Sequence, residues 1–342
     1  MKNYTKWVTS SILISILSIV IVLIFTLDTT TTEIVRKIRP EYLLAALGIH
    51  MLSFIIWGLR TKSMASALGH KIGIITALEI VISSTFVAAI TPSSIGGEPL
   101  RIHLLSQNQM PIGKATAVVL GERLLDAILI LLIAPFSLLL FHGIMSNPTL
   151  DIVLISGELL LIVSLIFVLY AVLRPHNIKL AINVLVGWIA RLGGKKTGSK
   201  LSKLSESIDR EMEEFHNSMH IFFTEGRKGL FYGSIYTVIF WIVEFSLLPV
   251  ILLGLNQAPS VMIAFAAQAI LMIILIVPLT PGSSGIAEFS AITLFSFFVP
   301  ANALGITVAA WRAFTFYINL LVGGFVCFKL LKNTEMIQKY IK

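Results

Sequence analysis

Two short stretches, TPSSIGGE at residues 91–98 and TPGSSGIAE at residues 280–288, decide the fold of this chain. Both contain Thr-Pro, paired serines with glycine, and then a glutamate, with one residue of slippage between them. Each follows an apolar run and precedes a shorter helix-like segment. Because proline and glycine interrupt helices, each stretch predicts a break between two helical segments.

The similarity extends beyond the two stretches. Arg123 and Arg312 each lie 32 positions after the threonine of their stretch, and Glu79 and Gln268 each lie 12 positions before it. Four features at matched offsets predict an internal repeat.

Composition places this repeat in a membrane. Of the 342 residues, 56% are hydrophobic and only 13% charged, with a mean hydropathy of +0.90, whereas soluble chains carry about 25% charged residues. At roughly 20 residues per crossing, we predict an all-α polytopic membrane protein with about 8 spans plus two Thr-Pro-broken hairpin helices. The predicted spans are about 8–27, 41–59, 73–90, 113–141, 152–173, 229–253, 260–279 and 303–328, and the broken segments are 93–106 and 283–299.

The whole chain, residues 1–342, is expected to form a single integral membrane domain. Repeat 1 covers about 41–141 and repeat 2 about 229–328, with a cytoplasmic amphipathic loop at about 174–228 between them. Three predicted spans separate the two hairpins. If each hairpin returns to the side it entered from, the hairpins enter from opposite faces, which is the inverted-repeat architecture of secondary transporters.

Loop charge predicts the orientation. The segment 174–228 holds ten lysines and arginines, whereas loops 142–151 and 254–259 hold none, so the long loop and both termini are placed in the cytoplasm of a cell-membrane protein. Within this loop an apolar stripe from Leu201 to Phe222 recurs every three or four residues, which predicts a helix lying on the membrane or on the bundle. Loop 28–40 carries three cations and opposes this orientation.

Ionisable residues within spans are costly and are candidates for function. The planar fork of an arginine suits phosphate, so Arg123 and Arg312 could hold a lipid phosphate between the repeats. The two breaks could add backbone donors and helix N-termini. The predicted substrate-binding set is Arg101, Arg123, Arg312, Glu98, Glu288, Ser93, Ser94, Gly96, Gly97, Ser283, Ser284 and Gly285, and possible coupling or pairing residues are Glu79, Glu122, Asp126 and Glu244.

A purely structural interpretation stays open for these charges. Arg123 and Asp126 are three residues apart on one helix and can pair, and Glu98 can neutralise Arg101. A lone His50 is expected to be packed or hydrogen-bonded rather than to bind a ligand. We find no metal-ligand spacing, no nucleotide-binding loop and no nucleophile motif, and we expect no cofactor, no metal and no nucleic-acid partner.

The stretch TPSSIGGEPLR at residues 91–101 resembles the flippase-like membrane domain of lysylphosphatidylglycerol synthases, especially its free-standing members. The matching positions are Gly96, Gly97, Glu98, Pro99 and Arg101, with Pro281, Gly282, Gly285 and Glu288 in the second stretch. The resemblance implies translocation of lipids or lipid-linked head groups between leaflets. The chain ends at Lys342, soon after its last predicted span, so an aminoacyl-transfer domain is not expected.

We therefore expect a non-enzymatic, flippase-like transporter whose partners are membrane lipids with an anionic head group. Two alternatives are an ion-coupled carrier of a small anionic solute and a membrane enzyme that acts on lipids. A non-transporting assembly partner is a further possibility. The lipid, coupling ion, transport direction and oligomeric state do not follow from the sequence.

Overall fold

The computed structural model describes residues 29–91, 96–142, 213–275, 280 and 282–341, together with isolated positions among residues 17–20 and 152–170. The predicted spans at 8–27 and 152–173 therefore lie outside the continuous described ranges. So do Ser93, Ser94 and most of the predicted cytoplasmic loop.

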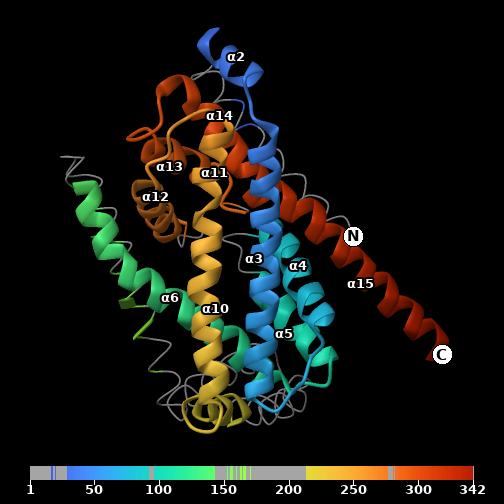
Figure 1. Cartoon of the computed structure of the whole chain (residues 1–342). Helices are drawn as coiled ribbons and strands as arrows, with labels where there is room; N and C mark the ends of the chain where they lie inside the picture. Colours follow the sequence, from blue (N-terminus) through green and yellow to red (C-terminus); the bar gives the residue numbers. More distant parts are fainter. Residues whose placement is uncertain are drawn as a thin grey trace, which may run out of the picture.

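The described residues form helices joined by turns, with no strand among them (Figure 1). The helices in chain order are α2 (Thr29–Arg36), α3 (Pro40–Ala67), α4 (Ile74–Ile90), α5 (Gly97–Gln107), α6 (Ile112–His142), α10 (Arg227–Phe245), α11 (Leu247–Gly254), α12 (Val261–Ile274), α13 (Ile286–Phe295), α14 (Ala301–Arg312), the π-helix η1 (Ala313–Ile318) and α15 (Asn319–Ile341). Four stretches are long and apolar enough to cross a membrane: Pro40–Ala67, Ile112–Phe141, Arg227–Gly254 and Ala301–Leu330. The all-α polytopic membrane fold is thereby confirmed.

Helix α3 is longer than predicted: it continues to Ala67 instead of ending near residue 59. No glycine or proline lies between Gly58 and Gly69, and Gly69 adopts a left-handed φ of +78°. The N–H groups of Gly69 and His70 donate to the carbonyls of Ser66 and Ala65, a Schellman arrangement that ends the helix. The extension matters because it places Arg60 inside a membrane helix.

Two other predicted spans are subdivided. The span at 229–253 consists of α10 and α11, which meet at Ser246, and the span at 303–328 contains the π-helix between α14 and α15. π-Helical turns are uncommon and often mark functional sites. This one begins directly after Arg312.

The first helices of the two repeats run antiparallel. The N–H of Arg39, at the start of α3, donates to the carbonyl of Gly254 at the end of α11 at 2.9 Å. At the opposite end, Gly229 of α10 faces Ala67 of α3. Figure 1 shows α3 and α10 side by side along the centre of the molecule. Equivalent helices that run in opposite directions are what an inverted repeat requires.

In each repeat, the helix that precedes the break packs against the last helix of the other repeat. α4 packs along α15, where Gly323 approaches the backbone of Ile82, and α12 packs along α6, where Ala134 clusters with Ile273. The offset of 189 positions that separates Thr91 from Thr280 also separates Ala134 from Gly323. Both repeats therefore use a small residue at the same position for this contact.

The two helix breaks touch one another. The N–H of Gly282 donates to the carbonyl of Thr91 at 3.0 Å, so backbone from one break satisfies backbone from the other. The Thr91 hydroxyl also accepts from the N–H of Gly96 at 3.0 Å and thereby ties α4 to α5. An unsatisfied backbone group in hydrocarbon costs several kcal/mol, which explains why irregular chain is placed against irregular chain.

The described helices form two main apolar cores. One core joins α3, α4, α5 and α6 to a helix at residues 213–223, whose Met219 and Phe222 are buried in it. The other joins α11, α12, α13 and α14 and also takes in Ala46 of α3 and Phe141 of α6, so it contains residues of both repeats. The described end of the apolar stripe in the loop therefore faces the bundle.

Replacing Gly282 with Ala should destabilise the fold. A Cβ there would lie 2.4 Å from the carbonyl oxygen of Ala89, and the backbone has a φ of +57°. We expect a loss of about 2–4 kcal/mol from combined strain and clash, measured as a lower midpoint of thermal unfolding in detergent.

Gly69→Ala is the matched control, because Gly69 shares the left-handed backbone but would place its Cβ in open space. It should cost only the backbone strain, about 1 kcal/mol. Equal losses of stability in the two variants would show that the contact between the breaks does not stabilise the fold.

Candidate functional site

A buried ion pair between Arg60 and Asp126 of repeat 1 contacts repeat 2 through α10. Arg60 of α3 donates from Nη1 to Oδ1 of Asp126 at 2.7 Å and from Nη2 to Oδ2 at 3.4 Å. Two residues of α10 complete this arrangement: Thr237 accepts from Arg60 at 3.2 Å, and Trp241 Nε1 donates to Asp126 at 2.9 Å. The pair thus brings together α3, α6 and α10.

A second carboxylate, Glu122, lies one turn earlier on α6. Its Oε2 accepts hydrogen bonds from Arg101 of α5 and from Trp57 Nε1 of α3, and Arg60 approaches it at 3.3 Å. Arg101 also donates to the hydroxyl of Thr61 at 3.1 Å. Arg60, Arg101 and Glu122 are each at most 1% exposed, so their charges stabilise one another inside the bundle.

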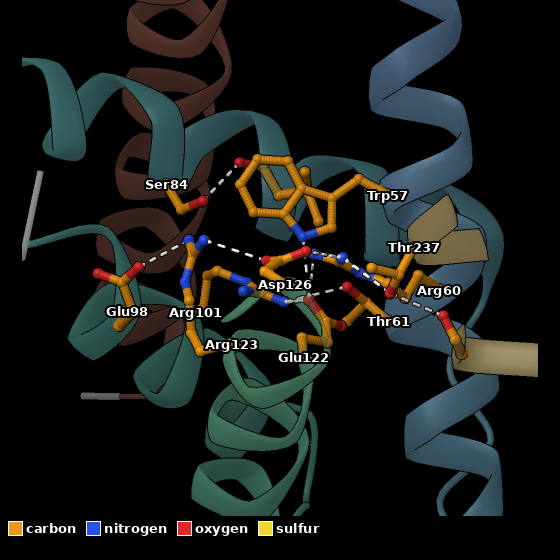
Figure 2. A network of polar contacts seen from close by, with 12 residues as sticks. Trp57, Arg60, Thr61, Ser84, Glu98, Arg101, Glu122, Arg123, Asp126 and Thr237 are labelled. Carbon is orange, nitrogen blue, oxygen red and sulfur yellow. Dashed lines mark hydrogen bonds and ion pairs between the residues drawn. The ribbon is translucent and has the colours of Figure 1, made fainter. Parts of the chain in front are cut away.

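Trp57 lies at the centre of this network (Figure 2). The guanidinium carbons of Arg101, Arg123 and Arg60 lie 5.1, 5.7 and 5.9 Å from its ring centroid. Cation–π contacts contribute roughly 0.5–2 kcal/mol, more where water is excluded. A single indole therefore helps to hold three like charges close together.

The Glu98–Arg123 pair forms the accessible end of the network. Arg123 Nη2 lies 2.7 Å from Oε1 of Glu98 on α5, and Arg123 Nη1 lies 3.4 Å from Asp126. The Arg123 and Glu98 side chains are 41% and 25% exposed, in contrast to the deeper members. Figure 2 shows Glu98 at one end of the network and Thr237 toward the other.

Formal charge in the network is balanced by three arginines and three carboxylates, namely Arg60, Arg101, Arg123, Glu98, Glu122 and Asp126. Its hydrogen bonds are not balanced: Nε and Nη1 of Arg101, Nε of Arg123 and Oε1 of Glu122 are buried without a protein hydrogen-bond partner. The network therefore has hydrogen-bonding capacity that its internal pairing does not use.

Repeat 2 holds a corresponding but buried pair. Arg312 Nε donates to Oε1 of Glu288 at 2.8 Å, and Arg312 Nη2 lies 3.3 Å from the hydroxyl of Ser284. The two side chains are 5% and 0% exposed. Each repeat thus pairs the glutamate after its break with the arginine 32 positions after its threonine.

The structure distributes the predicted site residues over these two pairs and their surroundings. Arg123 pairs with Asp126 as predicted, but Glu98 pairs with Arg123 where Arg101 was the expected partner. Arg101 lies beside Glu122, and Arg312 beside Glu288, so each arginine is bound to a carboxylate of its own repeat. The convergence of Arg123 and Arg312 on one phosphate stays a prediction.

Several backbone donors in the described parts of the breaks are already used within the protein. The N–H of Gly96 donates to Thr91, that of Ser283 to Thr280, and that of Gly285 to Oε2 of Glu288. Gly97 packs against the carbonyl of Ser84. An anion at either break would have to replace these hydrogen bonds, so the arginine side chains are the stronger candidates for anion contact.

The remaining candidates lie elsewhere. Glu79 of α4 pairs with Lys329 of α15 at 2.9 Å, while Gln268 at the matched position donates to the carbonyl of Phe245 at 2.7 Å. Glu244 lies 3.5 Å from His50. Among the residues that the structure describes, no three His, Cys, Asp or Glu side chains are arranged to hold a metal ion.

Sequence reasoning missed Arg60 and the residues that surround it. Arg60 lies one position beyond the predicted end of the first span in repeat 1, where an arginine is usually interfacial. The absence of any helix breaker between residues 60 and 68 was the available signal. Thr61, Thr237 and Trp241 carry no such signal, because polar contacts of threonine and tryptophan do not show in a sequence pattern.

With the geometry in place, comparison with known proteins gives the family. Residues 10–323 match the family described as the lysylphosphatidylglycerol synthase TM region. The chain belongs to this family. A UPF0104 membrane protein of Archaeoglobus fulgidus is 32% identical over 94% of this chain and 97% of its own length. UPF0104 membrane proteins of Pyrococcus horikoshii and Methanocaldococcus jannaschii are 22% and 23% identical over 90% and 95% of this chain, and over 91% and 96% of their own lengths.

Replacing Glu122 with Gln should destabilise the protein strongly. The change keeps the shape of the side chain but leaves Arg60 and Arg101 with one carboxylate fewer in a buried setting. Removing one partner of a buried ion pair costs about 3–5 kcal/mol, measured by thermal or denaturant unfolding in detergent.

The control is Glu33→Gln, which removes the exposed Glu33–Lys37 pair of α2. Exposed pairs contribute roughly 0–1 kcal/mol, so this variant should unfold like the wild type. A Glu122 variant as stable as the wild type would mean that the network is not held together by these charges.

Proposed function

We propose that this protein binds the phosphate of an anionic membrane lipid at Arg123 and carries the head group between leaflets, while the acyl chains stay in the surrounding lipid. The observation that carries the proposal is the 41% exposure of the Arg123 side chain at the edge of an otherwise buried, charge-balanced network. The lipid is not changed covalently in this proposal.

Exchange of one anion for another provides a binding step at modest cost. Arg123 is held by Glu98 on one side and Asp126 on the other, and Glu98 is the more exposed carboxylate. A phosphate can replace Glu98 and form bidentate contacts with the guanidinium fork. Asp126 stays bound to Arg60, so the buried part of the network need not rearrange.

The second repeat supplies an equivalent arginine that can bind the phosphate. Arg312 is bound to Glu288 in the same way, but this pair is buried. One glutamate–arginine pair is thus accessible and the other is closed, and the breaks of the two repeats touch. This arrangement suits a mechanism in which each pair opens toward a different leaflet. In this mechanism both termini and the loop at 174–228 face the cytoplasm, and the protein resides in the cell membrane. The family description, which names a lipid synthase, supports a lipid substrate.

Replacing Arg123 with Ala should reduce transfer of fluorescent phosphatidylglycerol between the leaflets of proteoliposomes at least tenfold, because the phosphate loses its guanidinium partner. Arg312→Ala should have a similar effect. The measurement is quenching of the outer-leaflet fluorophore by dithionite, with insertion checked separately.

Arg36→Ala is the control, since Arg36 is an exposed arginine of α2 remote from the network in sequence; it should transfer lipid like the wild type. Undiminished transfer by both Arg123 and Arg312 variants would remove these residues from the mechanism. Uptake of soluble phosphate without lipid transfer would favour a carrier of small anions instead.

Replacing Glu98 with Gln should separate binding from transfer. Without the competing carboxylate, Arg123 should bind anionic lipid several-fold more tightly, since a charge-assisted pair is lost on the protein side. Release should slow, so the transfer rate should fall. Native mass spectrometry of retained lipid and the leaflet assay measure the two effects, and weaker lipid binding by this variant would contradict the exchange step.

A further inference from the structure

Three polar residues meet in a second buried site that the anion-exchange mechanism does not use. His50 of α3 is 2% exposed, and its Nε2 lies 2.8 Å from Oδ1 of Asn319, the first residue of α15. Its Nδ1 lies 3.5 Å from Oε1 of Glu244 on α10, whose side chain is 20% exposed. Phe54 packs edge-on against the imidazole at 4.9 Å.

The hydrogen bond between His50 and Asn319 leaves the other ring nitrogen of His50 facing Glu244. The amide nitrogen of Asn319 donates to the carbonyl of Thr315 at 2.6 Å, so its oxygen accepts from His50 and keeps the proton on Nε2. The other ring nitrogen, Nδ1, then faces Glu244. The 3.5 Å separation is an ion-pair distance, and Nδ1 has no hydrogen-bond partner in the described structure. Because two facing lone pairs would repel, one proton on the pair, as imidazolium with carboxylate or as imidazole with carboxylic acid, is the arrangement that removes the repulsion. Both forms have no net charge.

Short stretches of helix link this site to both glutamate–arginine pairs. Glu244 is three residues after Trp241, which donates to Asp126 in the first network, and His50 lies seven residues, two turns, before Trp57. Asn319 is separated from Arg312 only by the π-helix. A displacement at either arginine pair would therefore reach the histidine through a short stretch of helix.

We propose that His50 and Glu244 form a proton-binding site that takes up one proton with each anionic head group, so that the head group and the proton move together. The inference rests on the proposed function. At rest the pair holds one proton and is neutral. When a monoanionic phosphodiester is bound, a second proton converts the pair to imidazolium beside carboxylic acid. The positive charge of the pair then balances the negative charge of the phosphodiester. Release of the head group returns that proton on the other side.

Charge balance favours this stoichiometry. A net charge in the membrane is costly and its movement depends on the membrane potential, whereas one anion with one proton avoids both penalties. The resting pair has no net charge to compensate a bound anion, and the first network is already balanced. The histidine–glutamate pair can therefore supply the missing positive charge.

The acidic residues of the neighbouring helices α4 and α6 are paired elsewhere in the described structure. Glu79 of α4 pairs with Lys329, and the acidic residues of α6, Glu122 and Asp126, pair with arginines. The sequence of α11 contains no titratable residue, and Tyr317 of the π-helix interacts with Arg312. Glu244 is thus the titratable group that the described contacts bring to the His50 ring.

The test uses proteoliposomes with fluorescent phosphatidylglycerol, a pH gradient and a potassium-valinomycin potential. For one proton per monoanion, a gradient of one pH unit should drive an equilibrium leaflet ratio of about tenfold, and a potential alone should drive none. An internal pH dye should record acidification as the labelled lipid moves inward. His50→Asn and Glu244→Gln should lose the response to the gradient.

His103→Asn and Glu225→Gln are matched controls on exposed residues, and both should respond like the wild type. Wild-type transfer that ignores the pH gradient, or that follows the potential, would overturn the proton inference and leave lipid transfer intact. Absence of wild-type transfer would instead overturn the proposed function. The wild-type measurements decide the question even if a variant fails to fold.

Discussion

The ion pair between Arg60 and Asp126 fixes how the two halves of this membrane protein meet. Charges in hydrocarbon are tolerated only when they are paired, and this pair takes its members from α3 and α6 and its neutral partners Thr237 and Trp241 from α10. A buried pair of this kind need not add net stability, but it can specify one arrangement of helices. Glu122, Arg101 and Trp57 extend the same constraint to α5, and the network ends at the half-exposed Arg123.

A one-residue difference between the repeats changes the role of equivalent glutamates. Glu288 is the third residue of α13, where its carboxylate can accept from the N–H of Gly285 and close the helix start while it binds Arg312. Glu98 is the second residue of α5 and instead extends to Arg123. Similar sequences thus produce one buried pair and one accessible pair, an asymmetry that a transporter with two alternating openings would need.

Much of the fold could be predicted from local pattern. Span lengths, the two Thr-Pro breaks and the matched arginines follow from hydropathy and spacing, and the Arg123–Asp126 pair follows from helical periodicity. The partner of Glu98 and the place of Arg60 could not be predicted in this way. Both depend on how far α3 continues and how close α5 lies to α6, and neither distance is encoded in a local stretch of sequence.

By itself, the sequence determined that the chain crosses a membrane repeatedly, and it predicted two related halves and the place where each breaks, because hydrophobic length and proline placement act within one segment. The tertiary structure alone decided which charges are neutralised, which arginine stays accessible, and that His50 and Glu244 share a site. These outcomes depend on contacts between helices that are distant in the chain. In a medium without water, such contacts decide whether a charge is structural or free to bind.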